Sequence, residues 1–164
     1  MNTTQTTRVP VRAFLIPVVA ALGIGAAWVA LSAYHYKSDG GRSYFRKNVE
    51  DLKAGSTNWL FIVLIRDADP LLEEIRGMPE VEHVAIEASR ISIVGMRHLG
   101  TLPNLKTVKA YYSEHQTGVS DEGMLELRNC KKLEALLIFG GLTQEGIAEI
   151  NRQMPNVRVI TEHE

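Results

Sequence analysis

A short apolar pattern that returns at nearly regular intervals constrains the fold of this chain more than any other feature. The pattern is LxxLxL, in which any aliphatic residue fills the marked positions, and its copies are Leu60, Val63 and Ile65; Val81, Val84 and Ile86; Leu105, Val108 and Ala110; Leu133, Leu136 and Ile138; and, incompletely, Val157 and Ile160. Successive first positions are 21, 24, 28 and 24 residues apart (81−60, 105−81, 133−105, 157−133). A period of this length is typical of solenoids built from stacked repeats.

A second apolar series, at helical spacing, follows each of the first four copies. Its members are Leu72, Ile75 and Met78; Met96, Leu99 and Leu102; Met124, Leu127 and Cys130; and Ile147, Ile150 and Met154. Ser120 and Thr143 are predicted N-caps of two of these helices, and Asp69, before Pro70, is the predicted cap of an earlier one. Because one strand–loop–helix unit cannot bury its apolar stripe alone, the units must stack. The sequence therefore predicts an α/β solenoid with a parallel sheet on one face and helices on the other.

Two of the units resemble a known repeat family. The segments GVSDEGMLELRNCKKLEALLI and GLTQEGIAEINRQMPNVRVI are similar to leucine-rich repeats of the ribonuclease-inhibitor-like class, and the similarity covers about Leu60 to Thr161. The Asn, Cys or Thr that usually follows the strand is missing in most units; Glu87, Ser113 and Gly140 are nearby instead. The family consists of binding scaffolds, so the resemblance implies recognition of a partner and no reaction type.

An uncharged segment near the start predicts a membrane span. Residues 13–34 are 22 residues without a charged side chain, and as a helix they would reach roughly 33 Å, against a hydrocarbon core of about 30 Å. This length exceeds that of a secretory h-region, which favours an uncleaved signal anchor over a removable peptide. We expect a single-pass membrane protein with a short cytoplasmic tail and an exported, periplasmic or extracytoplasmic repeat domain.

These features divide the chain into four predicted regions. They are a polar tail at 1–12, a transmembrane signal anchor at 13–34, a linker and capping helix at 35–57, and the leucine-rich-repeat domain at 58–164. In the third region, Tyr44, Phe45, Val49 and Leu52 recur at roughly helical spacing. This helix is expected to cover the apolar end of the first repeat.

Charge and motif content argue against several functional classes. The formal net charge of −1 lacks the basic footprint that nucleic-acid binding requires, so no nucleic-acid partner is predicted. Cys130 is the only cysteine, which excludes an internal disulfide and a cysteine-based zinc site. The sequence has no GxSxG, P-loop or GxGxxG motif, and its histidines are scattered. We therefore expect no catalytic activity, no cofactor and no metal.

Strand alternation predicts where a partner would bind. Residues between the buried positions point to the exposed face of the sheet, and the predicted exposed columns are Ile62, His83, Thr107, Ala135 and Val159; Leu64, Ala85, Lys109, Leu137 and Thr161; and Arg66, Glu87, Tyr111, Phe139 and His163. Tyr111, Leu137 and Phe139 would form an exposed apolar cluster, as partner sites do. The alternative is that another segment covers these residues or that they belong to the core.

A long loop adjoins this cluster. The segment YYSEHQTG, residues 111–118, makes its unit four residues longer than the preceding one (28 against 24). Such insertions often bind ligands, although tolerated drift explains them equally well. The candidate partner-binding residues are Tyr111, Tyr112, Glu114, His115, Leu137 and Phe139. The expected function is that of a membrane-tethered, non-catalytic protein-recognition module; the alternative is a structural envelope protein that self-associates through its repeats.

Overall fold

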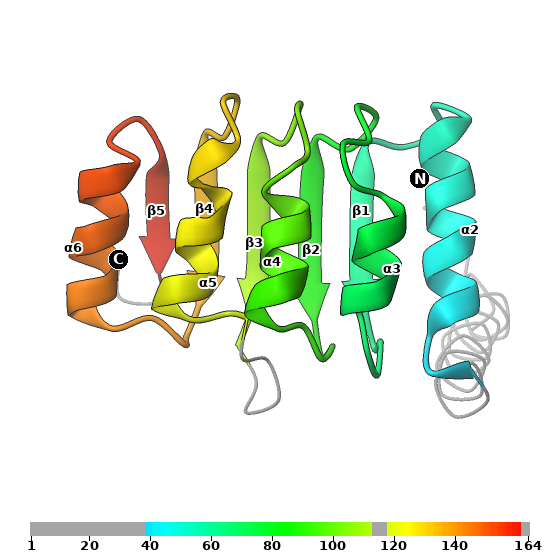
Figure 1. Cartoon of the computed structure of the whole chain (residues 1–164), viewed down its shortest axis with the longest axis horizontal. Helices are drawn as coiled ribbons and strands as arrows, with labels where there is room; N and C mark the ends of the chain where they lie inside the picture. Colours follow the sequence, from blue (N-terminus) through cyan, green and yellow to red (C-terminus); the bar gives the residue numbers. More distant parts are fainter. Residues whose placement is uncertain (1–38, 113–117, 162–164) are drawn as a thin grey trace, which may run out of the picture. The chain divides into compact units, whose positions relative to one another are not determined.

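Strands and helices alternate along the part of the chain that the computed structural model describes, residues 39–112 and 118–161. The strands are β1 (Trp59–Val63), β2 (His83–Glu87), β3 (Thr107–Tyr111), β4 (Ala135–Phe139) and β5 (Arg158–Thr161). The helices are α2 (Arg42–Lys53), α3 (Asp69–Glu74), α4 (Ile93–Leu99), α5 (Asp121–Leu125) with the 3-10 helix η1 (Glu126–Asn129), and α6 (Gln144–Gln153). The strands form one parallel sheet in the order β1-β2-β3-β4-β5 (Figure 1).

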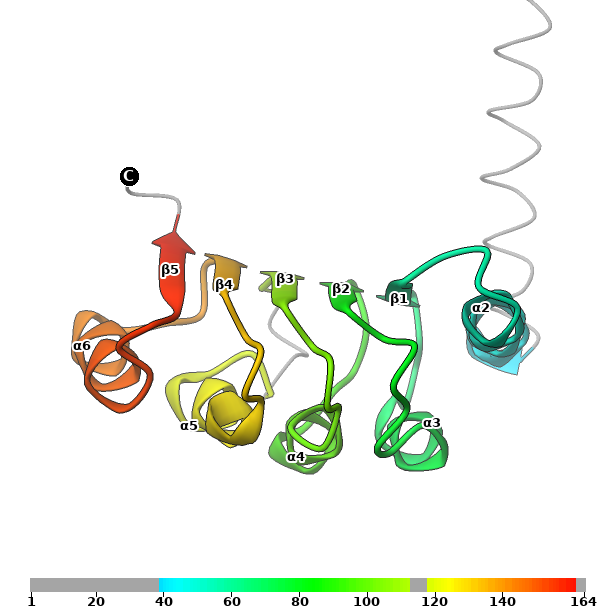
Figure 2. The same cartoon turned by 90° about the horizontal axis from the view of Figure 1, so that it is seen from above.

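The helices α3 to α6 lie along one face of this sheet (Figure 2). The core fills the space between the two layers, and its fully buried members include Leu60, Ile62, Leu72, Val84, Ile86, Met96, Leu99, Val108, Met124, Leu127, Leu136, Ile138 and Ile150. Burying each large aliphatic side chain contributes about 1.5–3 kcal/mol relative to leaving it exposed. The described chain is therefore an α/β structure with a parallel five-stranded sheet.

Helix α2 lies against the outer edge of β1. Its apolar face buries Phe45 and Leu52, and Asn48 between them is also buried. The Asn48 Nδ2 atom donates to the carbonyl of Trp59 at 3.0 Å, and the amide of Phe61 donates to Asn48 Oδ1 at 2.7 Å. A sheet edge normally exposes unpaired backbone groups that invite another strand. The Asn48 side chain satisfies two such groups in β1, the carbonyl of Trp59 and the amide of Phe61.

The helix starts agree only partly with the predicted caps. Ser120 and Thr143 are confirmed, since their hydroxyls accept from the amides of Gly123 and Gly146 at 3.3 and 2.9 Å. The cap predicted at Asp69 is wrong, because the N-cap of α3 is Ala68, which has no side-chain hydrogen bond.

Asp69 instead joins two neighbouring helices. Its carboxylate accepts from the backbone amide of Ser92, the N-cap of α4, at 3.0 Å, and from the Ser92 hydroxyl. Asp121 repeats the arrangement two strand–helix units later, accepting from the amide and hydroxyl of Thr143 at 3.0 and 2.6 Å. A Cβ at Gly95 or Gly146 would collide with these carboxylates. Each carboxylate thus links the start of one helix to the start of the next. The glycine, which has no Cβ, leaves space for that carboxylate.

Ser89 supplies the polar contacts at the turn after β2. Its side chain is buried, its hydroxyl donates to the carbonyls of Ile62 and Glu87 at 2.9 and 3.0 Å, and it accepts from the amide of Ile65 at 3.0 Å. Leu64, in the adjoining turn, adopts a left-handed φ of 54°. Ser89, two residues beyond the Glu87 noted in the sequence, therefore supplies the buried polar contacts of this turn.

The register predicted for β1 is wrong by three residues. Leu60 pairs with Val84, and Ile62 pairs with Ile86. Ile62, predicted to be exposed, is fully buried, whereas Val63, predicted to be buried, lies in the same row as Glu87. The cause is the uninterrupted apolar run WLFIV, which fits the LxxLxL template in more than one phase.

The register predicted for β5 is wrong by one residue. Val159 pairs with Leu136, so it continues the inward row, and Ile160 pairs with Leu137 on the opposite face. Val159 packs against the core accordingly. A shift of one residue exchanges the two faces of a strand. The predicted columns for β2, β3 and β4 agree with the observed pairing.

The predicted fold class included a transmembrane helix, and the structure does not support that prediction. Among the residues described, no helix is long and apolar enough to cross a membrane. The longest, α2, has 12 residues, which is about 18 Å at 1.5 Å per residue, against a hydrocarbon core of about 30 Å. The predicted tail and span, residues 1–12 and 13–34, lie outside the described residues. The transmembrane helix, and the localisation that rested on it, are not retained.

Candidate functional site

The face of the sheet opposite the helices carries the candidate site. Its side chains form three rows across the strands, which are Trp59, His83, Thr107, Ala135 and Arg158; Phe61, Ala85, Lys109, Leu137 and Ile160; and Val63 beside Glu87 with Tyr111 beside Phe139. No described helix or strand lies over these rows (Figure 2). We call this surface the open sheet face. Apart from Ala135, its residues are partly or fully exposed, which contrasts with the core on the other side.

One aromatic cluster lies on β3 and β4. The rings of Tyr111 and Phe139 stack with centroids 4.7 Å apart and an interplanar angle of 14°. This separation equals the spacing of neighbouring strands, so the sheet itself sets the stacking. Lys109 places its Nζ atom 5.1 Å from the Tyr111 centroid and 5.9 Å from that of Phe139, within cation–π range. Leu137 lies two residues before Phe139, on the same face of β4.

A second aromatic cluster lies on β1 and β2. Trp59 stacks on His83 with ring centroids 4.7 Å apart, and its ring lies 6.1 Å from that of Phe61. The Nδ1 atom of His83 is buried without a hydrogen-bond partner among the described residues. Trp59 and Phe61 were not among the predicted site residues, because the wrong register of β1 left both outside the exposed columns. All five residues of β1 are apolar, so no contrast between polar and apolar side chains in the sequence marks Trp59 and Phe61 as exposed.

Tyr112, another predicted site residue, does not belong to this face. Tyr112 lies beyond the end of β3, where its amide donates to the carbonyl of Phe139 at 3.0 Å. Its side chain packs on the backbone of Gly140 and Gly141, where an added Cβ would press against it. Both glycines have left-handed φ angles, 87° and 83°. Glu114 and His115 lie outside the described residues. The structure therefore brings Tyr111, Leu137 and Phe139 together and places Tyr112 at the carboxyl edge of the sheet.

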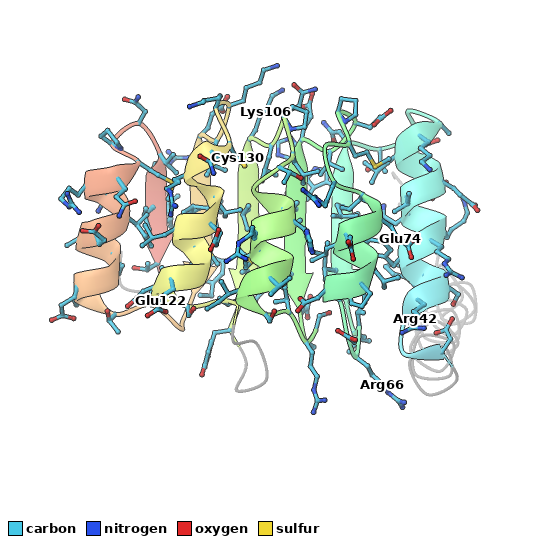
Figure 3. The ribbon with its side chains drawn as sticks, in the orientation of Figure 1. Arg42, Arg66, Glu74, Lys106, Glu122 and Cys130 are labelled. Carbon is cyan, nitrogen blue, oxygen red and sulfur yellow. The ribbon has the colours of Figure 1, made fainter. Side chains whose placement is uncertain are left out.

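Charged residues line the amino edge of the sheet. Lys106, at the upper edge in Figure 3, donates from Nζ to Glu82 Oε2 at 2.8 Å, and Asn58 donates to the same oxygen at 3.1 Å. The hydrogen bond from Lys106 lowers the pKa of Glu82, and the same bond raises the pKa of Lys106. Lys109 differs from Lys106, because no carboxylate of residues 39–112 or 118–161 forms an ion pair with it. The open sheet face thus carries a cation whose described contacts are with aromatic rings.

The described residues offer neither an activated cysteine nor a cluster of metal ligands. Cys130 is buried in the core layer, and burial raises the pKa of its thiol to about 11. The thiol is therefore protonated at neutral pH and a poor nucleophile. Within the described ranges no three His, Cys, Asp or Glu side chains gather where they could hold a metal ion.

Comparison with known proteins adds no family assignment. No family model matches the chain, and no curated protein matches it significantly. The resemblance to leucine-rich repeats therefore stays a prediction from two segments of the sequence.

Proposed function

We propose that this chain is a non-catalytic protein-recognition module, built from leucine-rich-like repeats, whose ligand binds the open sheet face. The observation that carries the proposal is the pair of aromatic clusters left partly exposed there, with Tyr111 at 41% relative exposure. Aromatic rings bring a large apolar area to an interface with few rotamers to restrict.

The arrangement of the clusters supports binding. Each ring is held by its neighbour, by the strand that carries it and, for Tyr111 and Phe139, by Lys109. A ligand that docks on pre-ordered side chains does not have to restrict their rotation, so less of the binding free energy is lost. The core does not need these rings, because the inward rows already fill the space between sheet and helices.

The test is affinity capture with matched variants, followed by measurement of the affinity for the captured protein. Phe139→Ala and Tyr111→Ala should leave the thermal midpoint nearly unchanged but weaken binding roughly thirtyfold, as expected for a loss of about 2 kcal/mol at an aromatic anchor. Lys131→Ala, at an exposed position before β4, is the control and should bind as the unsubstituted protein does.

Two outcomes would contradict the proposal. If the aromatic variants melt far below the unsubstituted protein and still capture the partner fully, the rings stabilise the fold and recognition occurs elsewhere. If the captured protein is only another copy of this chain, and sedimentation shows dimers that Phe139→Ala dissociates, the alternative of a self-associating structural protein takes the place of the recognition module.

A further inference from the structure

The size of the open sheet face limits what can occupy it. Five strands spaced by about 4.8 Å, each contributing about five residues at about 3.3 Å, make a surface of roughly 20 by 16 Å, or about 300–400 Å². A stable dimer or domain interface buries about 800 Å² on each partner. A second copy of this chain or a folded domain would therefore have to extend beyond the face, whereas about seven residues of extended chain would span it.

The charge on the face limits the chemistry of such a segment. Lys109 lies in the middle row of the sheet, between Ala85 and Leu137 on the neighbouring strands. It is partly buried, and no described carboxylate forms an ion pair with it. By contrast, Lys106, Arg97 and Arg152 each have a glutamate partner. A ligand carboxylate would complement this cation at the centre of the face, since the other charged side chains of the face, Glu87 and Arg158, lie in its outer rows.

The distance between the two aromatic clusters limits the spacing of the ligand's side chains. The cluster on β1 and β2 and the cluster on β3 and β4 are separated by about two strand spacings, and they also lie in different rows. A diagonal of about 14 Å joins them, which is the length of four residues of extended chain. In an extended chain, residues i, i+2 and i+4 project on the same side.

We propose that the open sheet face binds an extended peptide segment with apolar or aromatic side chains at positions i and i+4 and a carboxylate at i+2. The side chain at i contacts Phe61 and His83, the carboxylate pairs with Lys109, and the side chain at i+4 contacts Tyr111 and Phe139. This inference rests on the proposed function, since it names the ligand class of the same surface. It requires no rearrangement of the sheet.

The probe is a fluorescently labelled, end-blocked heptapeptide, Ser-Phe-Thr-Asp-Thr-Phe-Ser, measured by anisotropy at low ionic strength. One control peptide replaces Asp with Asn, and a second moves the later Phe one position earlier. The unsubstituted protein should bind the first peptide about threefold to fivefold more tightly than the Asn peptide, as expected for a partly exposed ion pair. The displaced Phe should weaken binding at least as much, because its ring then faces away from the sheet.

Protein variants identify the contacts. Lys109→Met keeps the length of the side chain and should bind the Asp and Asn peptides equally. Phe61→Ala and Phe139→Ala should each weaken binding of the Asp peptide. Lys131→Met, which lies away from the face, should leave that binding unchanged.

The inference is overturned if no peptide binds, if the Asp and Asn peptides bind equally, or if the displaced Phe makes no difference. The capture experiment then separates the two proposals. Loss of the captured partner in Phe139→Ala would leave the recognition function standing with another ligand class, whereas retention of the partner would overturn both.

Discussion

At the scale of single residues, position in the strand decides whether a side chain stabilises the fold or is free to bind. Leu136 and Lys109 show the contrast, because they lie on adjacent strands and differ in facing direction. Leu136 is fully buried between sheet and helices, whereas Lys109 extends over the rings of the open sheet face. Their substitution should therefore affect different properties.

We expect Leu136→Ala to lower the free energy of unfolding by about 2–5 kcal/mol, because it removes buried methyl groups and leaves a cavity. Lys109→Ala should cost less than about 1 kcal/mol, since it loses only a partly exposed cation–π contact. Urea denaturation of both variants measures the difference. Equal losses would mean that the two strands do not share the register described above.

Residue identities predicted some of these roles and missed others. Ser120 and Thr143 could be recognised as caps because a hydroxyl residue before a helix has one common use. Asp69 could not be assigned correctly, because its partner, Ser92, is 23 residues away and only stacking brings the two together. Ser89 was missed for the same reason: its acceptor in β1, the carbonyl of Ile62, belongs to another unit.

At the scale of elements, contacts between neighbouring strand–helix units hold the helices and strands in their stacking order. Asp69 and Asp121 tie helix starts together, Arg97 of α4 donates to Glu126 of η1 at 3.0 and 3.3 Å, and Asn48 of α2 satisfies the edge of β1. The contact of α2 with β1 differs from the others, because it joins a helix to backbone groups of a strand. Removing the Asn48 side chain should expose the carbonyl of Trp59 and the amide of Phe61 at the edge of β1.

We expect Asn48→Ala to destabilise the protein by about 1–3 kcal/mol, because it leaves the carbonyl of Trp59 and the amide of Phe61 without partners in a buried contact. The amide hydrogen of Phe61 should exchange faster in the same variant. Arg46→Ala, at an exposed position of the same helix, is the control and should change the stability by less than about 0.5 kcal/mol. An unchanged exchange rate at Phe61 would show that another group protects the edge.

The sequence predicted which segments form strands and helices more reliably than it predicted the pairing register of each strand. The strands β2 and β3 place polar, aromatic or small side chains between the buried ones, and their registers were predicted correctly; the register of the apolar strand β4 was also correct, since Leu133, between polar residues, sets the phase of its LxxLxL copy. In β1 every residue is apolar, so neither hydrophobicity nor spacing distinguishes Trp59 and Phe61 from Leu60 and Ile62. Half of the candidate site was missed because of this one ambiguous strand.

At the scale of the whole molecule, the described chain is a one-dimensional stack in which each strand contacts only its neighbours. Stability in such a stack is close to a sum of unit and interface contributions. The two outermost strands are not equivalent. β1 is covered by α2, whereas β5 pairs only with β4 among the described strands, and its residues are half-buried or exposed.

We expect native-state hydrogen exchange to reveal this asymmetry. The amides of β5 should exchange at least about tenfold faster than those of β2 and β3, because local opening at the end of a stack breaks only one interface. The amide of Phe61 in β1 should exchange slowly, since Asn48 holds it. Equal protection in β5 and β3 would show that the stack opens only as a single cooperative unit.

The contact between Asn48 and β1 also restricts how copies of this chain could polymerise. Cross-β fibres grow because each added molecule presents a fresh edge for the next one. Here two outward backbone groups of β1, the carbonyl of Trp59 and the amide of Phe61, are already bonded to Asn48, so a strand arriving there would have to displace that side chain. β5 is the less protected edge, so we expect native sheets to join there first. Joining of two β5 edges uses up both of them and stops at a pair, and we therefore expect Asn48 to hinder fibre elongation through β1.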